Sequence, residues 1–343
     1  MIKNNLLLIV LVGLTAVRLL WLCDFKTMEC RDGGGNKPSG LATSSKHLSN
    51  YTVSVQNFIT SQVRKVFPSP HSELLLGLTI GLNDLKKVSR FNDVLLVTGT
   101  VHVVVVSGYN INLVFNLIIS ILGSKYKLKN LITAQVLTFI YAVICGLGAP
   151  VIRAWIMGSI VSWGAYYGRK FEALRILFIS ALFMVMVVPS FLFSLSFQLS
   201  FLATLSLMMF SGIFVDRIGV LDDFKTTIAA QILVWPLISY RFGRISLISP
   251  IVNWLILWTI PLATVLGFIF ILLSAVWSYL GYLGSFVLYL PLDFFVKIVY
   301  FFGNLPFASI NFKISLSFLL AYYFILFAGY FSYSIVSSKN ENV

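Results

Sequence analysis

Long apolar stretches separated by short polar turns fill the chain from residue 100 onward. A helix needs about 20 mostly apolar residues to cross the hydrocarbon core of a bilayer. The pattern predicts membrane spans at residues 100–123, 130–148, 150–167, 173–189, 191–213, 226–242, 248–275, 281–302 and 314–336. With an N-terminal helix the total is about ten, within a range of about nine to eleven. The predicted fold class is therefore an all-α polytopic membrane protein.

The first hundred residues show a different pattern. An uncleaved anchor helix is predicted at the N-terminus, because Lys3 precedes an apolar run and bulky residues follow where a signal peptidase requires small ones. A polar, glycine-rich linker follows, and then an amphipathic helix over 51–67 that is predicted to lie on the membrane surface. Residues 72–99 predict a re-entrant or interfacial hairpin, since their apolar run is too short to span. The predicted organisation is an anchor helix at 1–22, an extracytoplasmic linker at 23–50, an amphipathic and re-entrant segment at 51–99 and a polytopic channel domain at 100–336.

Composition agrees with a membrane protein, and the positions of the cations predict its orientation. Of 343 residues, 58% are hydrophobic and 11% are charged, whereas soluble proteins carry about 25% charged residues. Two cation clusters lie in loops two spans apart, namely Lys125, Lys127 and Lys129 in one and Arg169, Lys170 and Arg175 in the other. Cytoplasmic loops are enriched in Lys and Arg, so both loops are predicted inside a bacterial cell membrane, with both chain termini cytoplasmic. The net charge of +13 fits this rule, and it also fits attraction to a polyanion.

Cysteine and histidine positions predict neither a metal centre nor a cofactor. Cys23 and Cys30 flank a short polar stretch, and they either pair on an oxidising side of the membrane or stay free. Cys145 lies in an apolar run and is interpreted as a packing residue. The three histidines are scattered, and no GxxxxGK[ST] phosphate-binding loop is present, so no nucleotide motor is expected in this chain.

The first candidate functional residues are polar ones near the start of the 100–123 stretch: His102, Ser107, Gly108 and Asn110. Polar side chains at membrane depth usually face a bundle interior or a cavity, and Ser107 with Gly108 could break the helix and expose backbone groups. The alternative is hydrogen bonding between helices. His102 and Ser107 are five residues apart and point in different directions on one helix, so a nucleophile–base pair is not expected. No catalytic residue is predicted, and the chain is not expected to be an enzyme.

Two further candidates lie later in the chain. Arg153 is within one turn of a span start and has no acidic residue nearby. It either extends to the membrane interface or offers a fixed cation to an anionic substrate. Gln198 lies among serines inside a span, where it either joins helices or contacts a lumen. Seven prolines from Pro150 onward, including Pro261, are interpreted as span ends and kinks, or as helix breaks beside a substrate site.

Five segments resemble the ComEC competence family, in the same order and with similar spacing. They are Leu74-Leu-Leu-Gly77-Leu-Thr-Ile-Gly81, His102…Ser107-Gly108-Tyr109-Asn110-Ile111, Arg153-Ala-Trp-Ile-Met157, Ser194-Leu-Ser-Phe-Gln198-Leu-Ser-Phe201, and Phe242-Gly243-Arg244 through Asn253. The resemblance covers residues 50–310. It departs from the family pattern at Asn110, where that pattern has a second histidine.

The resemblance implies a membrane channel that takes single-stranded DNA into the cytoplasm during natural transformation. It also implies partners: membrane lipids, a surface DNA receptor and a cytosolic ATP-driven motor, with homo-oligomerisation left open. Larger family members carry an external OB-like domain and a C-terminal metallo-β-lactamase-like domain. Residues 23–50 and the residues after Ser338 are too few for either domain, so this chain is expected not to cut DNA by itself.

Physical requirements are compatible with that interpretation, since a path for a single strand needs cations for phosphates and flat rings for bases. Arg241 and Arg244 lie near predicted outer span ends, with Tyr240 and Phe242 close by, although an interfacial aromatic belt accounts for the rings equally well. The main alternative function is a secondary transporter or lipid-handling protein for a small anionic substrate, built on broken helices around Arg153. A structural membrane subunit, in which the polar residues are only packed, is the third.

Overall fold

The computed structural model describes Thr15 and residues 23–24, 29–30, 46–82, 84–104, 107–124, 126–214 and 222–340. The predicted N-terminal anchor helix and most of the predicted linker lie outside these residues. Within the linker, strands β1 (Cys23–Asp24) and β2 (Glu29–Cys30) pair antiparallel with Cys23 opposite Cys30. A disulfide between the two cysteines stays a prediction.

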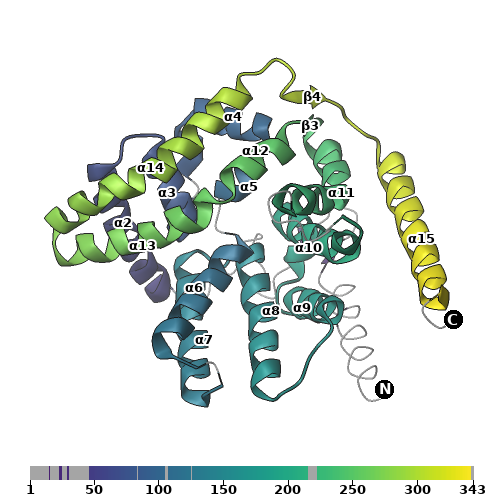
Figure 1. The fold of residues 1–343 in the computed structure, drawn as a ribbon, viewed down its shortest axis with the longest axis horizontal. Coiled ribbons are helices and arrows are strands. Elements are labelled where there is room, and N and C mark those ends of the chain that lie inside the picture. The colour runs from purple at the N-terminus through teal and green to yellow at the C-terminus, as the bar shows by residue number, and fades with distance from the viewer. Residues whose placement is uncertain are drawn as a thin grey trace.

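The rest of the described chain is almost entirely helical, which confirms the all-α class (Figure 1). The helices are α2 (Lys46–Val66), α3 (His71–Ile80), η1 (Asp84–Lys87), α4 (Ser89–Thr98), α5 (Val101–Val104), α6 (Gly108–Leu122), α7 (Leu128–Ile144), α8 (Ala149–Tyr166), α9 (Ala173–Val187), η2 (Pro189–Phe193), α10 (Leu195–Phe214), α11 (Asp222–Phe242), α12 (Ser249–Ile256), α13 (Thr259–Val276), α14 (Ser278–Gly303) and α15 (Leu316–Asn340). Strands β3 (Arg244–Ser246) and β4 (Ser309–Asn311) form a second two-stranded antiparallel sheet.

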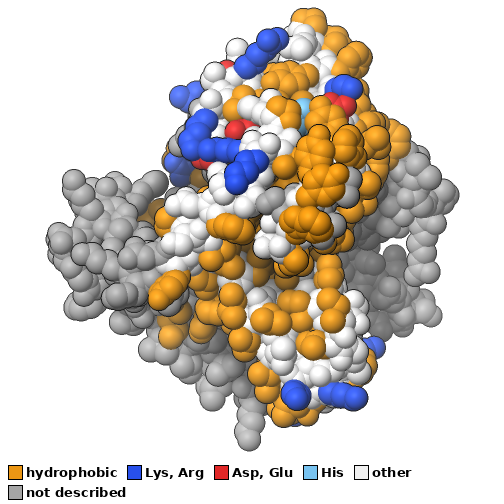
Figure 2. Space-filling model, turned by 90° about the vertical axis from the view of Figure 1, so that its left-hand side faces the viewer, with side chains coloured by type: hydrophobic (Ala, Val, Ile, Leu, Met, Phe, Trp, Pro, Cys, Tyr) orange, Lys and Arg blue, Asp and Glu red, His pale blue; other side chains and the backbone are white. Residues whose placement is uncertain are grey.

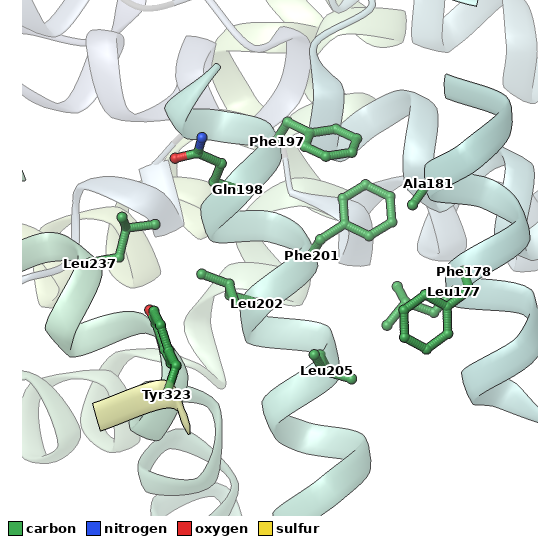
Figure 3. Close-up of a pocket in the computed structure, with 10 residues that line it drawn as sticks. All are labelled: Leu177, Phe178, Ala181, Phe197, Gln198, Phe201, Leu202, Leu205, Leu237 and Tyr323. Carbon is green, nitrogen blue, oxygen red and sulfur yellow. The ribbon is translucent and has the colours of Figure 1, made fainter. Parts of the chain in front are cut away.

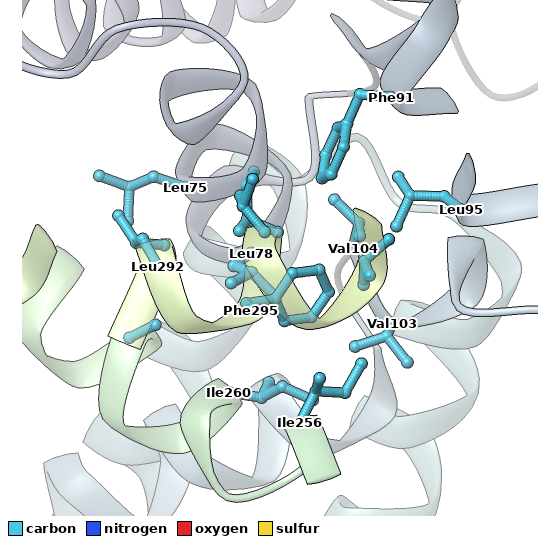
Figure 4. Close-up of a cluster of buried hydrophobic side chains, with 14 of the residues drawn as sticks. Leu75, Leu78, Phe91, Leu95, Val103, Val104, Ile256, Ile260, Leu292 and Phe295 are labelled. Carbon is cyan, nitrogen blue, oxygen red and sulfur yellow. The ribbon is translucent and has the colours of Figure 1, made fainter. Parts of the chain in front are cut away.

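Helix α3 is the centre of the largest hydrophobic core. All ten of its residues are buried, as expected of a helix that is apolar on every side. It packs against α2, α5, α13 and α14, and Leu75 and Leu78 meet Leu292 and Phe295 of α14 in this core (Figure 4). The segment predicted over 72–99 forms α3, η1 and α4. Whether it is re-entrant or interfacial stays a prediction.

The remaining helices form two further groups beside this core (Figure 1). Helices α6, α7 and α8 pack against one another, and α8 also contacts α9 and α10. Helix α10 packs along α11. Helix α15 lies at the edge of the molecule, where the hydroxyl groups of Tyr322 and Tyr323 donate to the carbonyl oxygens of Ile232 and Leu233 on α11, at 3.1 and 2.7 Å.

One predicted span is divided in the structure. The apolar stretch 248–275 forms α12 and α13, with the break at Leu257 and Trp258. Pro261 explains the division: a proline has no N–H to donate, and its ring clashes with the carbonyl group four residues earlier, here that of Leu257. That carbonyl instead accepts from the N–H of Ile260 at 3.3 Å.

The described residues contain three stretches that are long and apolar enough to cross a membrane: Val101–Leu122, Thr259–Val276 and Gly284–Gly303. Shorter apolar helices are Leu128–Ile144, Ala173–Val187, Leu195–Phe210 and Leu316–Tyr330. The predicted total of about ten spans is not confirmed by these stretches and stays a prediction.

The surface pattern agrees with contact to lipid. Figure 2 shows a face on which hydrophobic side chains gather between basic side chains above and below. Helices α13 and α14 carry large exposed apolar side chains, among them Leu272, Val276, Phe286 and Leu290. Exposed apolar area on this scale is unusual on a monomeric soluble protein and typical of a surface that another apolar phase covers.

Candidate functional site

The predicted helix break at Ser107 and Gly108 is confirmed. Ser107 has extended backbone angles (φ −94°, ψ 168°), and α6 begins at Gly108, so the helix is interrupted at Ser107. The Ser107 side chain makes no capping hydrogen bond to α6. The Ser107 carbonyl oxygen accepts from the N–H of Asn110 at 3.1 Å, while the first N–H groups of a helix have no partner within that helix.

Gly108 allows Arg153 of α8 to approach this break closely. A Cβ atom at Gly108 would lie 3.2 Å from Nη2 of Arg153 and 3.1 Å from Cβ of Ala154. Both distances are shorter than ordinary van der Waals contact between such atoms. The structure thus brings together two of the candidates that the sequence places 45 residues apart (108 and 153).

Arg153 is a half-buried cation without an acidic partner among the described residues. Its guanidinium carbon lies 5.8 Å from the ring centroid of Phe201 on α10, and its Nε atom is buried with no hydrogen-bond partner. Burial of an unpaired charge is costly, and a cation–π contact recovers only about 0.5–2 kcal/mol of that cost. Among the described residues, no carboxylate neutralises this guanidinium.

Gln198 lies on the same helix as Phe201, one turn earlier. Its Nε2 donates to the carbonyl oxygen of Leu192 in η2 at 3.0 Å, which fastens the α9–α10 connection. The residue also borders a cavity of about 340 Å³ between α9, α10, α11 and α15, whose other lining residues are Leu177, Phe178, Ala181, Phe197, Phe201, Leu202, Leu205, Leu237 and Tyr323 (Figure 3). Apart from Gln198 and the Tyr323 hydroxyl, this lining is apolar.

A second, more polar cavity of about 290 Å³ lies at the start of α8, one turn before Arg153. It is lined by Gly81, Cys145, Gly148, Ala149, Pro150, Val151, Phe191, Ser194 and Ser196. The backbone of Pro150 is also close to Gly108, since a Cβ atom there would lie 3.8 Å from the Pro150 carbonyl oxygen. Gly108 therefore lies close both to Pro150, which lines this cavity, and to Arg153.

Asn110 lies apart from this region. Its side chain is completely buried, and its Nδ2 donates to the carbonyl oxygen of Leu78 on α3 at 2.9 Å. This bond joins α6 to α3, as expected from hydrogen bonding between helices, which was the alternative to a place on a cavity wall. A part for Asn110 in a substrate path stays a prediction.

His102 belongs to a different polar group. Its side chain is exposed. It lies beside Gly99, where a Cβ atom would be 2.9 Å from Oγ of Ser249. A part in a substrate path stays a prediction for His102.

Ser249 connects two buried amides that sequence reasoning did not single out as site residues. Its Oγ accepts from Nε2 of Gln231 at 2.8 Å and from Nδ2 of Asn253 at 3.2 Å. The amide oxygens of Gln231 and Asn253 have no hydrogen-bond partner. Gln231 could have been predicted as a site residue in the same way as Gln198, because each is a large amide within an apolar stretch. Asn253 enters the sequence analysis only as the end of a motif.

An ionic cluster joins α3 and α14. Asp293 and Lys297 are four residues apart on α14 and form an ion pair, with Nζ 2.7 Å from Oδ2. Asp293 also meets His71, whose Nε2 is 3.4 Å away and whose ring stacks on Tyr289. This contact could not be predicted because His71 and Asp293 are far apart in the sequence. Within the part of the chain that the structure describes, no group of three His, Cys, Asp or Glu side chains is arranged to hold a metal ion.

Comparison with known families identifies the class of protein. Residues 86–335 match the family model described as Competence protein. The chain belongs to the Competence protein family. The family match and the apolar helices together make it a membrane protein of competence. The matched residues include His102, Ser107, Gly108, Arg153 and Gln198, so the region around the helix break lies within the shared part.

Two curated relatives agree with this assignment. The chain is 25% identical over 216 residues to ComE operon protein 3 of Bacillus subtilis, covering 59% of this chain and 26% of that protein. It is 27% identical over 218 residues to an uncharacterized protein of Aquifex aeolicus, covering 57% of this chain and 52% of that protein. The chain thus spans about half or less of the length of these relatives. No solved structure matches.

Proposed function

We propose that this chain forms a membrane path through which single-stranded DNA enters the cytoplasm during natural transformation. The observation that carries the proposal is Arg153, a cation without a carboxylate partner that lies against a broken helix in a competence-family protein. The family description, Competence protein, and the similarity to ComE operon protein 3 support the same process.

The chemistry of a single strand fits this region. Proteins that pass or hold single strands combine cations for the phosphates with aromatic rings on which bases stack. Guanidinium groups suit phosphate oxygens because their N–H groups form a planar fork. Arg153 supplies the cation, Phe201 lies beneath it as a ring, and the backbone at Ser107 and Gly108 supplies polar groups.

The proposed topology is multi-pass, with both termini in the cytoplasm. The α6–α7 and α8–α9 turns lie at one end of the molecule (Figure 1), and they carry the exposed cations Lys127, Lys129, Arg169 and Lys170. By the positive-inside rule this end faces the cytoplasm, which puts the start of α8 toward the outer side. In this proposal a surface receptor delivers the strand, an ATP-driven motor draws it inward, and nuclease activity resides outside the described helices.

Replacement of Arg153 tests the proposal. Cells that make equal amounts of wild-type, Arg153→Ala and Arg153→Lys protein are supplied with labelled DNA, and the protected intracellular label is measured. Uptake is expected to fall about tenfold or more for Arg153→Ala, since a charge-assisted contact contributes about 1.5–3 kcal/mol, and to fall less for Arg153→Lys. Arg175→Ala is the matched control, because Arg175 is exposed and already paired with Glu172 at 2.8 Å. Wild-type uptake by Arg153→Ala would remove this site from the mechanism.

A lipid-handling or small-anion transport function is the second candidate, and the cavity of about 340 Å³ favours it, because an apolar lining suits an acyl chain. Filling this cavity with Leu237→Trp distinguishes the two functions. The DNA path predicts little change in uptake, since Leu237 on α11 lines the cavity but packs in a different cluster from Phe201, the ring beside Arg153. Loss of uptake in Leu237→Trp with normal uptake in Arg153→Ala would favour the lipid function.

A further inference from the structure

The small β3–β4 sheet joins the end of α11 to the segment after α14. Arg244 pairs with Asn311 across the sheet, and the pairing continues at both ends, with the Phe312 N–H donating to the Gly243 carbonyl at 2.9 Å and the Leu247 N–H to the Ala308 carbonyl at 3.2 Å. The Ser239 hydroxyl on α11 also donates to the Phe312 carbonyl. These bonds make a defined platform at the end of the molecule opposite the α6–α7 and α8–α9 turns (Figure 1).

Three cations gather on this platform. Arg241, Arg244 and Lys313 are exposed, and none of them forms an ion pair with a described residue. Lys313 lies over the α11–β3 turn, since a Cβ atom at Gly243 would be 3.7 Å from Cβ of Lys313. No Asp or Glu occurs within residues 241–249 or 304–315, so the local charge is uncompensated.

Exposed aromatic rings accompany these cations. Phe242, Phe307 and Phe312 are 53%, 60% and 53% exposed. Phe242 lies next to Arg241 in sequence and Phe312 next to Lys313, while Phe307 precedes β4 at the other end of the sheet. Unpaired cations interleaved with accessible rings are the pattern with which proteins bind single-stranded nucleic acid, because phosphates pair with the cations while bases stack on the rings.

The position of these cations argues for a ligand. The positive-inside rule predicts few Lys and Arg residues in outer loops, yet in the topology proposed above this platform lies on the outer side. Anionic lipid headgroups are the competing partner for cations beside exposed phenylalanines. Single-stranded DNA is favoured because the cations and rings are fixed on a paired sheet, whereas residues that extend to lipid need no such rigid support.

We propose that the β3–β4 platform, defined as Arg241, Phe242, Arg244, Phe307, Phe312 and Lys313, binds single-stranded DNA on the outer side before the strand reaches Arg153. The inference rests on the proposed function and adds to it an entry site that is separate from the helix break.

Binding of a fluorescent oligothymidylate to the full chain in zwitterionic nanodiscs tests the platform. A triple variant, Arg241→Gln, Arg244→Gln and Lys313→Gln, is expected to bind at least tenfold more weakly at 0.1 M salt. The dependence of log affinity on log salt is expected to flatten by about 2, since each phosphate contact to a single strand contributes about 0.7. The charge-matched control is Lys127→Gln, Lys129→Gln and Lys170→Gln at the opposite end, which should bind as the wild type does.

Unchanged oligonucleotide binding by the platform triple variant would overturn the inference. If the same variant also floats less well on phosphatidylglycerol vesicles, the cations are assigned to lipid headgroups instead of DNA. If the triple variant does not fold, a photocrosslinker at Phe312 replaces it. Crosslinking to DNA is expected there and not at Phe286, an equally accessible position on α14 that is 67% exposed; equal or absent crosslinking at Phe312 would also overturn the platform.

The same experiments separate the platform from the channel. Uptake tests the path, and it is expected to fall in Arg153→Ala; oligonucleotide binding tests the platform, and it is expected to weaken in the platform triple variant. Normal binding by the platform variant together with lost uptake in Arg153→Ala would reject the platform and leave the proposed path intact. Wild-type uptake in Arg153→Ala with weaker binding by the platform variant would reject the path through Arg153 and keep the platform.

Discussion

A single methyl group at Gly77 is predicted to disturb the broken helix from the side of the core. Gly77 lies on α3, and a Cβ atom there would be 2.3 Å from the carbonyl oxygen of Val104 and 3.0 Å from its Cγ1. Even a close C–H···O contact needs about 3.3 Å between carbon and oxygen, so α3 and the end of α5 must separate by about 1 Å in the Gly77→Ala variant.

The size of the effect follows from two opposing terms. Overpacking of a well-packed core costs about 1–3 kcal/mol and occasionally more, and a backbone obstruction belongs at the upper end because it cannot rotate away. Alanine is better than glycine inside a helix by about 1 kcal/mol. The net loss of stability for Gly77→Ala is therefore about 2 kcal/mol.

The prediction is checked by thermal unfolding in detergent, followed by DNA uptake at equal protein levels. Gly329→Ala is the control, because no atom lies within 4 Å of a Cβ atom at that helical glycine; it should keep or gain stability. Trimming the neighbour with Val104→Ala should not rescue Gly77→Ala, since the closest obstruction is backbone. Rescue by Val104→Ala, or an unfolding midpoint in Gly77→Ala equal to that of Gly329→Ala, would refute the reasoning.

Two further predictions concern packing and topology. Asn110→Ala should lower the free energy of unfolding by about 1–3 kcal/mol, because the Leu78 carbonyl loses a buried donor. Asn110→Asp should lower it further, since a carboxylate presents only acceptors to that carbonyl oxygen. Equal losses of stability in the two variants would show that the bond contributes little. In a variant without the three native cysteines, Ser124→Cys should react with a membrane-impermeant maleimide only after cell lysis and Gly148→Cys in intact cells. Labelling of both positions from the same side would disprove the topology.

Sequence patterns were most informative where the signal is local. The helix break before α6 could be predicted because Ser107 and Gly108 interrupt an apolar run, and the Asp293–Lys297 pair because residues four apart share a helix face. The division of the 248–275 stretch carried a local signal as well. Pro261 alone cannot distinguish a kink from a break, however, because that outcome depends on how α12 packs against α14.

Contacts between distant segments could not be predicted in this way. Nothing in an apolar run indicates that His71 will meet Asp293, or that Gln231 and Asn253 will share Ser249. Arg153 shows the same limit: its sequence predicted either a cation for an anionic substrate or extension to the interface, and only the packing of Gly108 and Phe201 shows that its guanidinium turns inward.

Unpaired polar atoms bear on what the interior of this protein contacts. Nε of Arg153 and the amide oxygens of Gln231 and Asn253 are buried without a protein partner. Each unsatisfied group costs about 1–3 kcal/mol, and bilayer hydrocarbon offers no water to reduce that cost. Helix packing alone leaves these atoms without partners. Under the proposed function, a path that periodically holds water and a charged strand would supply the missing partner of Arg153 at the helix break while the strand passes.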